Sequence, residues 1–243
     1  MYVIVLDTET ANTLEDDKGK LDLSNSLTYD IGWCVLDLES GKVVKTRSFM
    51  VWDMFHFKKE LMKTAYFADK IPQYWTEFFS GNRKLRNLQK IKRFLEADMK
   101  EFDTNIVCAH NAYFDLNALN TTLRYVTSSR QRYFFPYETE FWDTMRMASD
   151  TFCKDEDYIK YCYDNGYITA NNQVRKTAEI LYRYITNDEN FEESHTGLED
   201  VLIEKEILLA CENMGVPMRR KLFKDRPLTT TANDDIIIIE SEG

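Results

Sequence analysis

Two carboxylates follow the first apolar segment of the chain at a spacing that suits metal chemistry. The run from Tyr2 to Leu6 is β-branched and apolar, and Asp7 and Glu9 come directly after it. Residues i and i+2 of a strand project from the same face, so both side chains should point the same way, about 7 Å apart along the chain. Two carboxylates this close repel each other unless a positive charge lies between them. The pair predicts a site for Mg²⁺, which prefers oxygen ligands.

Two further segments carry residues of the same chemistry. Asp115 lies within a turn of the expected start of a helix that follows the apolar stretch 105–110. His195 precedes Asp200 by five residues, which would place the two side chains about 140° apart on an ideal helix. They can converge on one site only if His195 lies in a loop before the helix begins, and Gly197 favours that arrangement. Taken singly, these segments are more typical of an acidic turn, of an acid at a helix N-terminus and of a surface or core histidine.

The three segments occur as VLDTET, AHNAYFD and HTGLED, and in this order they resemble the DEDDh subgroup of the DnaQ-like exonuclease superfamily. The resemblance extends from Met1 to about Gly215 and looks closest to small phage-type or RNase T-like exonucleases. Ile31-Gly32 and Asp143-Thr144 match weaker positions of the family. His195 indicates the histidine subtype, because the tyrosine subtype would carry Tyr where Thr196 stands.

The resemblance implies hydrolysis of phosphodiester bonds from a 3′ end with two divalent ions, Mg²⁺ or Mn²⁺. Such ions lie about 3.5–4 Å apart and hold both the attacking and the leaving oxygen. By this resemblance Asp7 bridges both ions, Glu9 and Asp200 bind the ion that carries the water, and Asp115 helps to hold the other. His195 would take the proton from that water, since imidazole titrates near neutrality.

Several residues are candidates for contacts with the substrate. Asn111 and the backbone around Thr8 and Thr10 could contact the terminal nucleotide. The stretch from Arg83 to Arg93 holds six basic residues and no acid. If it is helical, its face of Arg83, Arg86, Lys90 and Arg93 could follow phosphates, with Arg86 and Lys90 at its centre. A solvated helix face is an equal alternative.

The elements that must position these residues suggest a single α/β domain over residues 1–217. Strands are expected at 2–6, 30–38, 42–52, 105–110 and near 140–146, and helices at 57–79, 85–102, from 112, 177–186 and 197–214. Pro72 should break the aromatic-rich helical segment 57–79, which belongs to a helical insertion at about 53–100. Hairpin-connected strands followed by alternating strands and helices predict a mixed sheet flanked by helices, and the resemblance implies a ribonuclease H-like fold.

Composition bounds the remaining expectations. The net charge is −10, from 31 basic and 41 acidic residues, which argues against a nucleic-acid binder until bound cations are considered. No apolar run approaches the ~20 residues of a membrane span, and the N-terminus lacks the features of a signal peptide. Five widely spaced cysteines without a CxxC pair indicate a reducing cytoplasm.

The expected partner is a nucleic acid with a 3′ end, most simply single-stranded DNA. An RNA-directed exoribonuclease of the same family, an endonuclease, and a polymerase-associated or scaffold binding module remain alternatives. RNase T-like relatives form dimers, so a homodimer is an option. Residues 218–243 run from basic to acidic and are expected to form a mobile tail. Its apolar segment 236–239 could add a strand to a partner's sheet, or have no partner.

Overall fold

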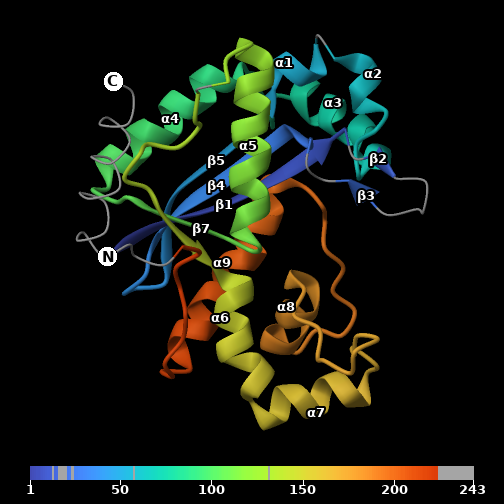
Figure 1. Ribbon diagram of the computed structural model, residues 1–243, viewed down its shortest axis with the longest axis vertical. Helices are drawn as coiled ribbons and strands as arrows, with labels where there is room; N and C mark the ends of the chain where they lie inside the picture. The colour runs from blue at the N-terminus through green and yellow to red at the C-terminus, as the bar shows by residue number, and fades with distance from the viewer. Residues whose placement is uncertain (13, 16–20, 23–24, 57, 131, 224–243) are drawn as a thin grey trace, which may run out of the picture.

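A mixed six-stranded sheet forms the centre of the protein in a computed structural model that describes residues 1–12, 14–15, 21–22, 25–56, 58–130 and 132–223 (Figure 1). The strands follow the order β6-β5-β4-β1-β7-β8. The three long strands pair antiparallel, whereas β7 and β8 run parallel to β1, and β6 runs parallel to β5. Their bounds are β1 Tyr2–Ala11, β4 Leu27–Asp37, β5 Lys42–Val51, β6 Lys84–Arg86, β7 Ile106–Ala109 and β8 Glu140–Asp143. The short strands β2 (Leu14–Glu15) and β3 (Leu21–Asp22) pair separately.

Alternation along the central strands divides the core into two layers. Ile4, Leu6 and Trp33 belong to one apolar cluster, and Val3 and Val5 belong to the other. The first cluster is covered by α1 (Trp52–Phe55), α3 (Ile71–Phe79), α4 (Leu88–Glu101) and α5 (Ala112–Thr127). The second is covered by α6 (Thr144–Asp150), α7 (Glu156–Asp164), α8 (Ala178–Thr186) and α9 (Gly197–Asn213). Both faces of the sheet are therefore buried by helices, which confirms the predicted α/β class with a mixed sheet.

Three expectations about element boundaries are wrong. The first strand does not end at Leu6 but continues to Ala11, so Asp7 and Glu9 lie inside β1. Pro72 does not break a helix; it stands in the first turn of α3, where its missing amide hydrogen costs nothing. The predicted helix 85–102 begins only at Leu88, because the preceding residues pair with β5 as β6.

The remaining elements lie at the edges of this arrangement. They are α2 (Lys59–Met62) and the 3₁₀ turns η1 (Ala68–Lys70) and η2 (Phe152–Lys154). Among the described residues, none of the helices has both the length and the apolar character of a membrane span.

The start of the expected tail is attached to the domain. The Arg220 carbonyl accepts a hydrogen bond from the Asp143 amide, and the Leu222 amide donates one to the Phe141 carbonyl, so the segment pairs beside β8. Arg219 forms an ion pair with Asp150. Residues 224–243, including the apolar segment 236–239, lie outside the described residues.

Candidate active site

Asp7 and Glu9 reach the site because the odd-numbered residues of β1 face α9. Val3 and Val5 pack in the α9-side cluster, and the same alternation carries the two carboxylates to that face at the far end of the strand. The pairing of β1 with β4 shifts register between Glu9 and Thr10. The strand thus delivers two carboxylates to one point, at its irregular end.

A contact between two glycines brings α9 close to this strand. Gly32 lies opposite Asp7 on β4, and a β-carbon on Gly32 would come within 2.4 Å of the Leu198 backbone nitrogen. A β-carbon on Gly197 would come within 2.9 Å of the Gly32 nitrogen. Only hydrogen atoms at both positions allow this approach. Asp200, in the first turn of α9, is brought beside β1 as a consequence.

Carboxylate oxygens of Asp7, Glu9 and Asp200 lie within 4.8 Å of one another. Glu9 and Asp200 are 6% and 5% exposed, so their charges have little water around them. Three convergent, poorly solvated oxygen ligands are the donor set that Mg²⁺ and Mn²⁺ favour. These residues therefore fit a divalent metal ion.

Asp115 reaches the site from α5, and its charge repels those of Asp7, Glu9 and Glu204. It lies in the first turn of α5, and the Thr8 hydroxyl donates a 2.8 Å hydrogen bond to its Oδ1. Its side chain is 4% exposed and does not line the pocket that the other carboxylates share. Asp115 is thus held beside Thr8, within interaction distance of Asp7 and Glu204.

Asn111 precedes α5, but its side chain does not cap the helix. Its φ is +71°, and its side chain makes no capping hydrogen bond. Instead its backbone amide donates a 3.1 Å hydrogen bond to Asp143 Oδ1. The left-handed turn leaves Asn111 on the wall of the pocket, where it remains a candidate for substrate contact.

His195 lies in the loop before α9, as convergence with Asp200 requires. Its ring stacks on Phe67 with centroids 3.8 Å apart, and its Nδ1 is 3.9 Å from Glu193 Oε2. Burial lowers the pKa of the His195 imidazole, and the nearby Lys70 lowers it further. The ring is therefore neutral near pH 7 and can accept a proton. Ser194, its neighbour, donates a 3.2 Å hydrogen bond to Asp200.

Burial and repulsion from neighbouring carboxylates raise the pKa values of Asp7, Glu9, Asp115 and Asp200. Burial is the largest cause for each. It raises the pKa of Glu9 to about 9, of Asp200 to about 8 and of Asp115 to about 7. The pKa of Asp7 rises well above its usual range, with repulsion from Glu204 as the second cause. A bound cation would reverse these shifts, because it favours the ionised form.

Two acids of this site were missed by the sequence analysis. Glu204 is 3% exposed and lies one turn after Asp200 on α9, and its Oε2 has no hydrogen-bond partner among the described residues. Glu193 lies beside His195, and burial raises its pKa to about 7. The i+4 spacing from Asp200 was the available indication for Glu204, whereas nothing local distinguishes Glu193 from its acidic neighbours.

A pocket of about 380 Å³ joins these groups. Asp7, Glu9, Asp200 and His195 line it, as do the expected contact residues Thr8, Thr10 and Asn111, together with Tyr66, Phe67, Phe114, Glu193 and Glu204. Arg86 and Lys90 do not line it. Seven of the sequence-predicted residues thus share one cavity, with aromatic side chains on its wall.

His110 also lines this pocket, whereas His56 does not. His110 is held by Thr144 through Nδ1 and by the Lys176 carbonyl through Nε2, both at 2.8 Å, and burial lowers its pKa to about 4. His56 stacks on Trp52. Both rings are therefore held by contacts with their neighbours.

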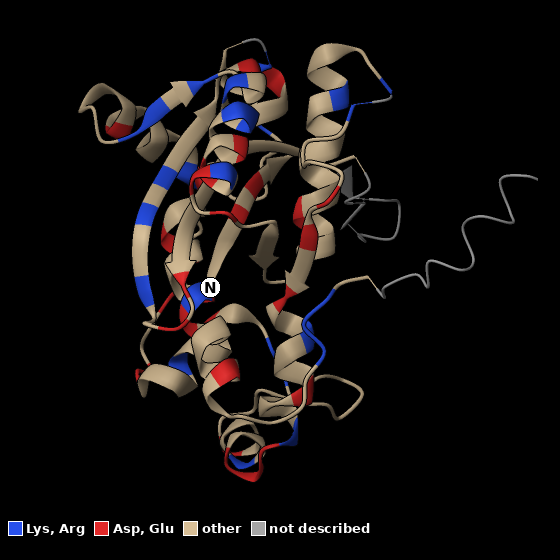
Figure 2. Cartoon of the chain, turned by 90° about the vertical axis from the view of Figure 1, so that its left-hand side faces the viewer, with Lys and Arg blue, Asp and Glu red and all other residues tan. Residues whose placement is uncertain are grey.

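The predicted basic helix face does not form. Arg83 is 5% exposed and paired with the buried Asp30, and Arg86 belongs to β6. Only Lys90 and Arg93 of that set lie on α4. Positive and negative residues are interspersed over the chain in Figure 2. The prediction of a continuous helical phosphate-binding face along 83–93 is therefore wrong. Arg86 and Lys90 remain individual candidates for contacts with phosphates.

A search of solved structures finds nucleases with the same fold, and three of them are described here. The nuclease domain of 3′hExo, a DEDDh family member bound to rAMP, is 12% identical with a TM-score of 0.56, over 93% of this chain and 97% of that one. A full-length 3′-exonuclease is 12% identical with a TM-score of 0.58, over 93% and 92%. Cell-death related nuclease 4 is 8% identical with a TM-score of 0.52, over 90% and 66%.

In comparisons by sequence, no family model and no curated protein matches the chain. The structural likeness confirms the ribonuclease H-like fold that the resemblance implied. At such low identity it shows the fold alone, and the phage-type subgroup stays a prediction.

Proposed function

We propose that this chain is a metal-dependent 3′–5′ exonuclease that hydrolyses phosphodiester bonds of single-stranded nucleic acid. One observation carries the proposal: carboxylates from β1 and α9 converge within 4.8 Å, in a pocket that also holds a neutral histidine. Paired ions held by carboxylates, beside a proton acceptor, are the groups that phosphodiester hydrolysis needs. A binding module of this fold would have no need for that costly concentration of buried charge.

Asp7, Glu9 and Asp200 would hold the divalent ions, with a contribution from Asp115, which the Thr8 hydroxyl holds near Asp7. Bound ions supply a water of lowered pKa and offset the charge of the phosphate. The carboxylates fix where water and phosphate meet. Glu204, buried beneath Asp200, adds negative charge that increases the affinity of the site for cations.

His195 takes the proton of the attacking water in this proposal. Its lowered pKa leaves the imidazole unprotonated at neutral pH, and Glu193 beside Nδ1 stabilises the imidazolium that forms. The Phe67 ring fixes the plane of the imidazole. Proton transfer therefore needs only a loop position that keeps the ring over the carboxylates.

The pocket wall offers contacts for a terminal nucleotide. Tyr66 is 55% exposed and could stack on a base, while the backbone at Thr8 and Thr10 and the Asn111 side chain offer polar groups. Arg86 and Lys90 would contact phosphates further along the strand. We expect binding to depend on divalent metal as well as on salt, because the net charge of the protein is −10.

Single-stranded DNA is the first candidate substrate, and RNA is the second. The structural neighbours include the 3′hExo nuclease domain bound to rAMP and a 3′-exonuclease that recognises the 3′ end of a histone mRNA stem-loop. The cytoplasmic location, the homodimer and a partner for the C-terminal tail remain predictions of the sequence.

A gel assay tests the proposal directly. Purified protein is incubated with Mg²⁺ or EDTA and with DNA or RNA, single- or double-stranded, labelled at either end; circular single strands report internal cutting. We expect stepwise loss from the 3′ end that disappears in EDTA and in Asp7→Ala and His195→Ala. His56→Ala and Asp164→Ala are matched controls that keep full activity. Equal activity in all four variants would contradict the assignment.

A further inference from the structure

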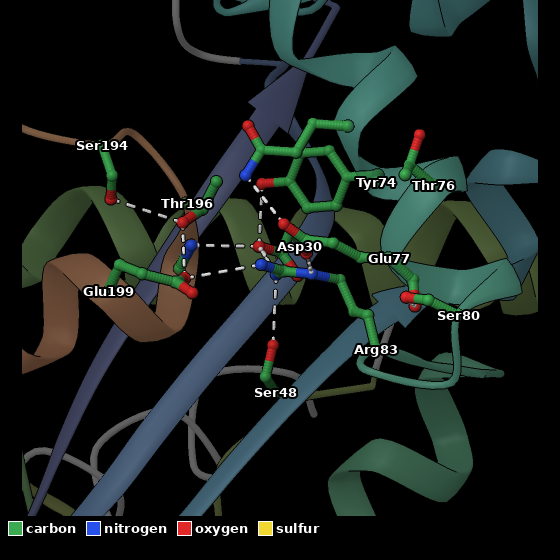
Figure 3. A network of polar contacts seen from close by, with 12 residues as sticks. Asp30, Ser48, Tyr74, Thr76, Glu77, Ser80, Arg83, Ser194, Thr196 and Glu199 are labelled. Atoms are coloured by element: carbon green, nitrogen blue, oxygen red, sulfur yellow. Dashed lines mark hydrogen bonds and ion pairs between the residues drawn. The ribbon is translucent and has the colours of Figure 1, made fainter.

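A buried carboxylate next to the site accepts hydrogen bonds from three segments outside its own strand. Asp30 on β4 is fully buried, and its Oδ2 accepts three hydrogen bonds: 2.9 Å from the Tyr74 hydroxyl, 2.9 Å from Arg83 Nη1 and 3.0 Å from the Gly197 amide (Figure 3). These donors come from α3, from the turn before β6 and from the first residue of α9. One oxygen therefore joins three segments that are distant in sequence.

Arg83 extends this junction toward the loop of the site. Its Nε donates a 2.6 Å hydrogen bond to Glu77, and its Nη2 lies 3.4 Å from Glu199 Oε2 (Figure 3). The Thr196 hydroxyl donates to the same Glu199 oxygen. The planar guanidinium fork thus connects the buried Asp30 with the residue that follows His195.

The loop that carries His195 is held on both sides of that residue. Thr196 is attached through Glu199 to Arg83, and Ser194 donates a hydrogen bond to Asp200. His195 itself has φ of +56°, a left-handed conformation that is uncommon for residues other than glycine. Such a conformation persists only where its surroundings enforce it.

Stability alone gives a poor account of this junction. All three donors meet at Oδ2, and Oδ1 of Asp30 is buried without a partner among the described residues. A buried ion pair with an unsatisfied oxygen is rarely more stable than apolar side chains of the same volume. A buried unsatisfied group of this kind calls for another explanation, such as the geometry that it imposes on neighbouring segments.

We infer that Asp30, Arg83 and Tyr74 form a clamp that positions His195, and that the helical insertion thereby sets the geometry of the site. This inference rests on the proposed nuclease function in that it assigns a catalytic task to His195. The clamp residues are positioning residues, since they reach His195 only through Gly197, Glu199 and Thr196. Loss of one arm should let the loop leave its strained conformation without disturbing β1 or its carboxylates.

The position of the His195 ring is tested first by NMR, a measurement that does not depend on nuclease activity. The chain has three histidines, so the Cε1–H signal of His195 can be assigned by comparison with His195→Ala. Stacking on Phe67 shifts this signal upfield in the wild type. Arg83→Lys, which keeps the charge but loses the fork, should move it toward the position of an unstacked histidine. Tyr74→Phe, which removes one hydroxyl, should move it less.

Two variants elsewhere in the fold serve as matched controls. Arg47 forks onto the buried Asp98 at 2.7 and 2.9 Å, and Tyr158 donates to the Arg175 carbonyl at 2.7 Å. Arg47→Lys removes a guanidinium fork and Tyr158→Phe removes a hydroxyl, as the clamp variants do, but at contacts elsewhere in the fold. If they move the His195 signal as far as the clamp variants do, the clamp is ordinary packing and the inference fails.

A kinetic double-mutant cycle then tests the consequence. Arg83→Lys should lower kcat about tenfold and change KM by less than about threefold, because orientation is lost while binding is retained. In a His195→Ala background the same substitution should change kcat by less than about twofold. An equal loss in both backgrounds overturns the inference. Absence of nuclease activity in the wild type would instead refute the proposed function, and the NMR result would still decide whether the clamp positions His195.

Discussion

Raising the pH from 6.5 to 8 without divalent metal should destabilise the folded protein. Burial and repulsion raise the pKa of Glu9 to about 9 and that of Asp200 to about 8, whereas carboxyl groups of an unfolded chain titrate near 4. Between these values the folded chain binds more protons than the unfolded chain. The free energy of unfolding must then fall as the pH rises.

The magnitude follows from the number of protons retained. Each proton held only by the folded state lowers the free energy of unfolding by about 1.4 kcal/mol per pH unit. The acids of the site interact strongly, so we count one proton for the cluster rather than one for each residue. Over 1.5 pH units the loss is about 2 kcal/mol, which lowers Tm by about 4–8 °C for a chain of this size.

The chosen pH range separates this effect from an opposing one. Burial lowers the pKa of His110 to about 4. The unfolded chain therefore binds the extra proton at this histidine below about pH 6.5, and stability rises with pH there. Above pH 6.5 the imidazole is neutral in both states. The slope from 6.5 to 8 then reports the carboxyl cluster.

Thermal melts in EDTA and in Mg²⁺ at half-unit pH steps measure the slope. Mg²⁺ binds the ionised carboxylates, so it should raise Tm most at pH 8 and remove the decline. Asp200→Asn should reduce the slope in EDTA, while Asp164→Asn, an exposed acid paired with Lys160, should leave it unchanged. A metal-free Tm that stays level or rises from pH 6.5 to 8 would refute the reasoning.

Three further variants have distinct expected outcomes. Gly32→Ala places a methyl group 2.4 Å from the Leu198 nitrogen, and should cost about 1–3 kcal/mol in urea unfolding and weaken Mn²⁺ binding, measured by calorimetry. Glu204→Gln removes a buried carboxylate whose Oε2 has no hydrogen-bond partner among the described residues, and it should stabilise the metal-free protein by about 1–2 kcal/mol, seen as a higher Tm in EDTA at pH 8. Asp98→Asn should cost about 3 kcal/mol in urea unfolding, because Arg47 loses its buried partner, with Mn²⁺ affinity unchanged; a loss of affinity would contradict the separation of the two sites.

Local patterns were sufficient for the features that depend on local geometry. The alternation from Tyr2 to Glu9 placed Asp7 and Glu9 on one face of a strand, and the angle between His195 and Asp200 required a loop before Gly197. Both conclusions follow from the fixed geometry of strands and helices. The α/β class also followed, because the order of strands and helices restricts the layers that can form.

Features that depend on contacts between distant residues were not predictable in this way. The run from Arg83 to Arg93 has the composition of a basic helix, but Arg83 pairs with Asp30, 53 residues earlier, and the residues after it pair with β5. Tertiary contacts override local propensity at such positions. Asn111 is of a residue type that often caps helices, yet its left-handed backbone turns its amide toward Asp143.

The acidity of the site connects its stability to its position in the fold. The half-buried Glu193 and the buried Glu204 add two acids to the carboxylates already expected, so the folded chain must hold protons or bind cations there. Repulsion of this kind pushes α9 away from β1 whenever the protons are lost. The Asp30 oxygen opposes that movement at Gly197, the residue where α9 begins. The clamp and the metal ions therefore act on the same displacement, and a clamp variant should depend more strongly on Mg²⁺ for its Tm at pH 8 than Arg47→Lys does.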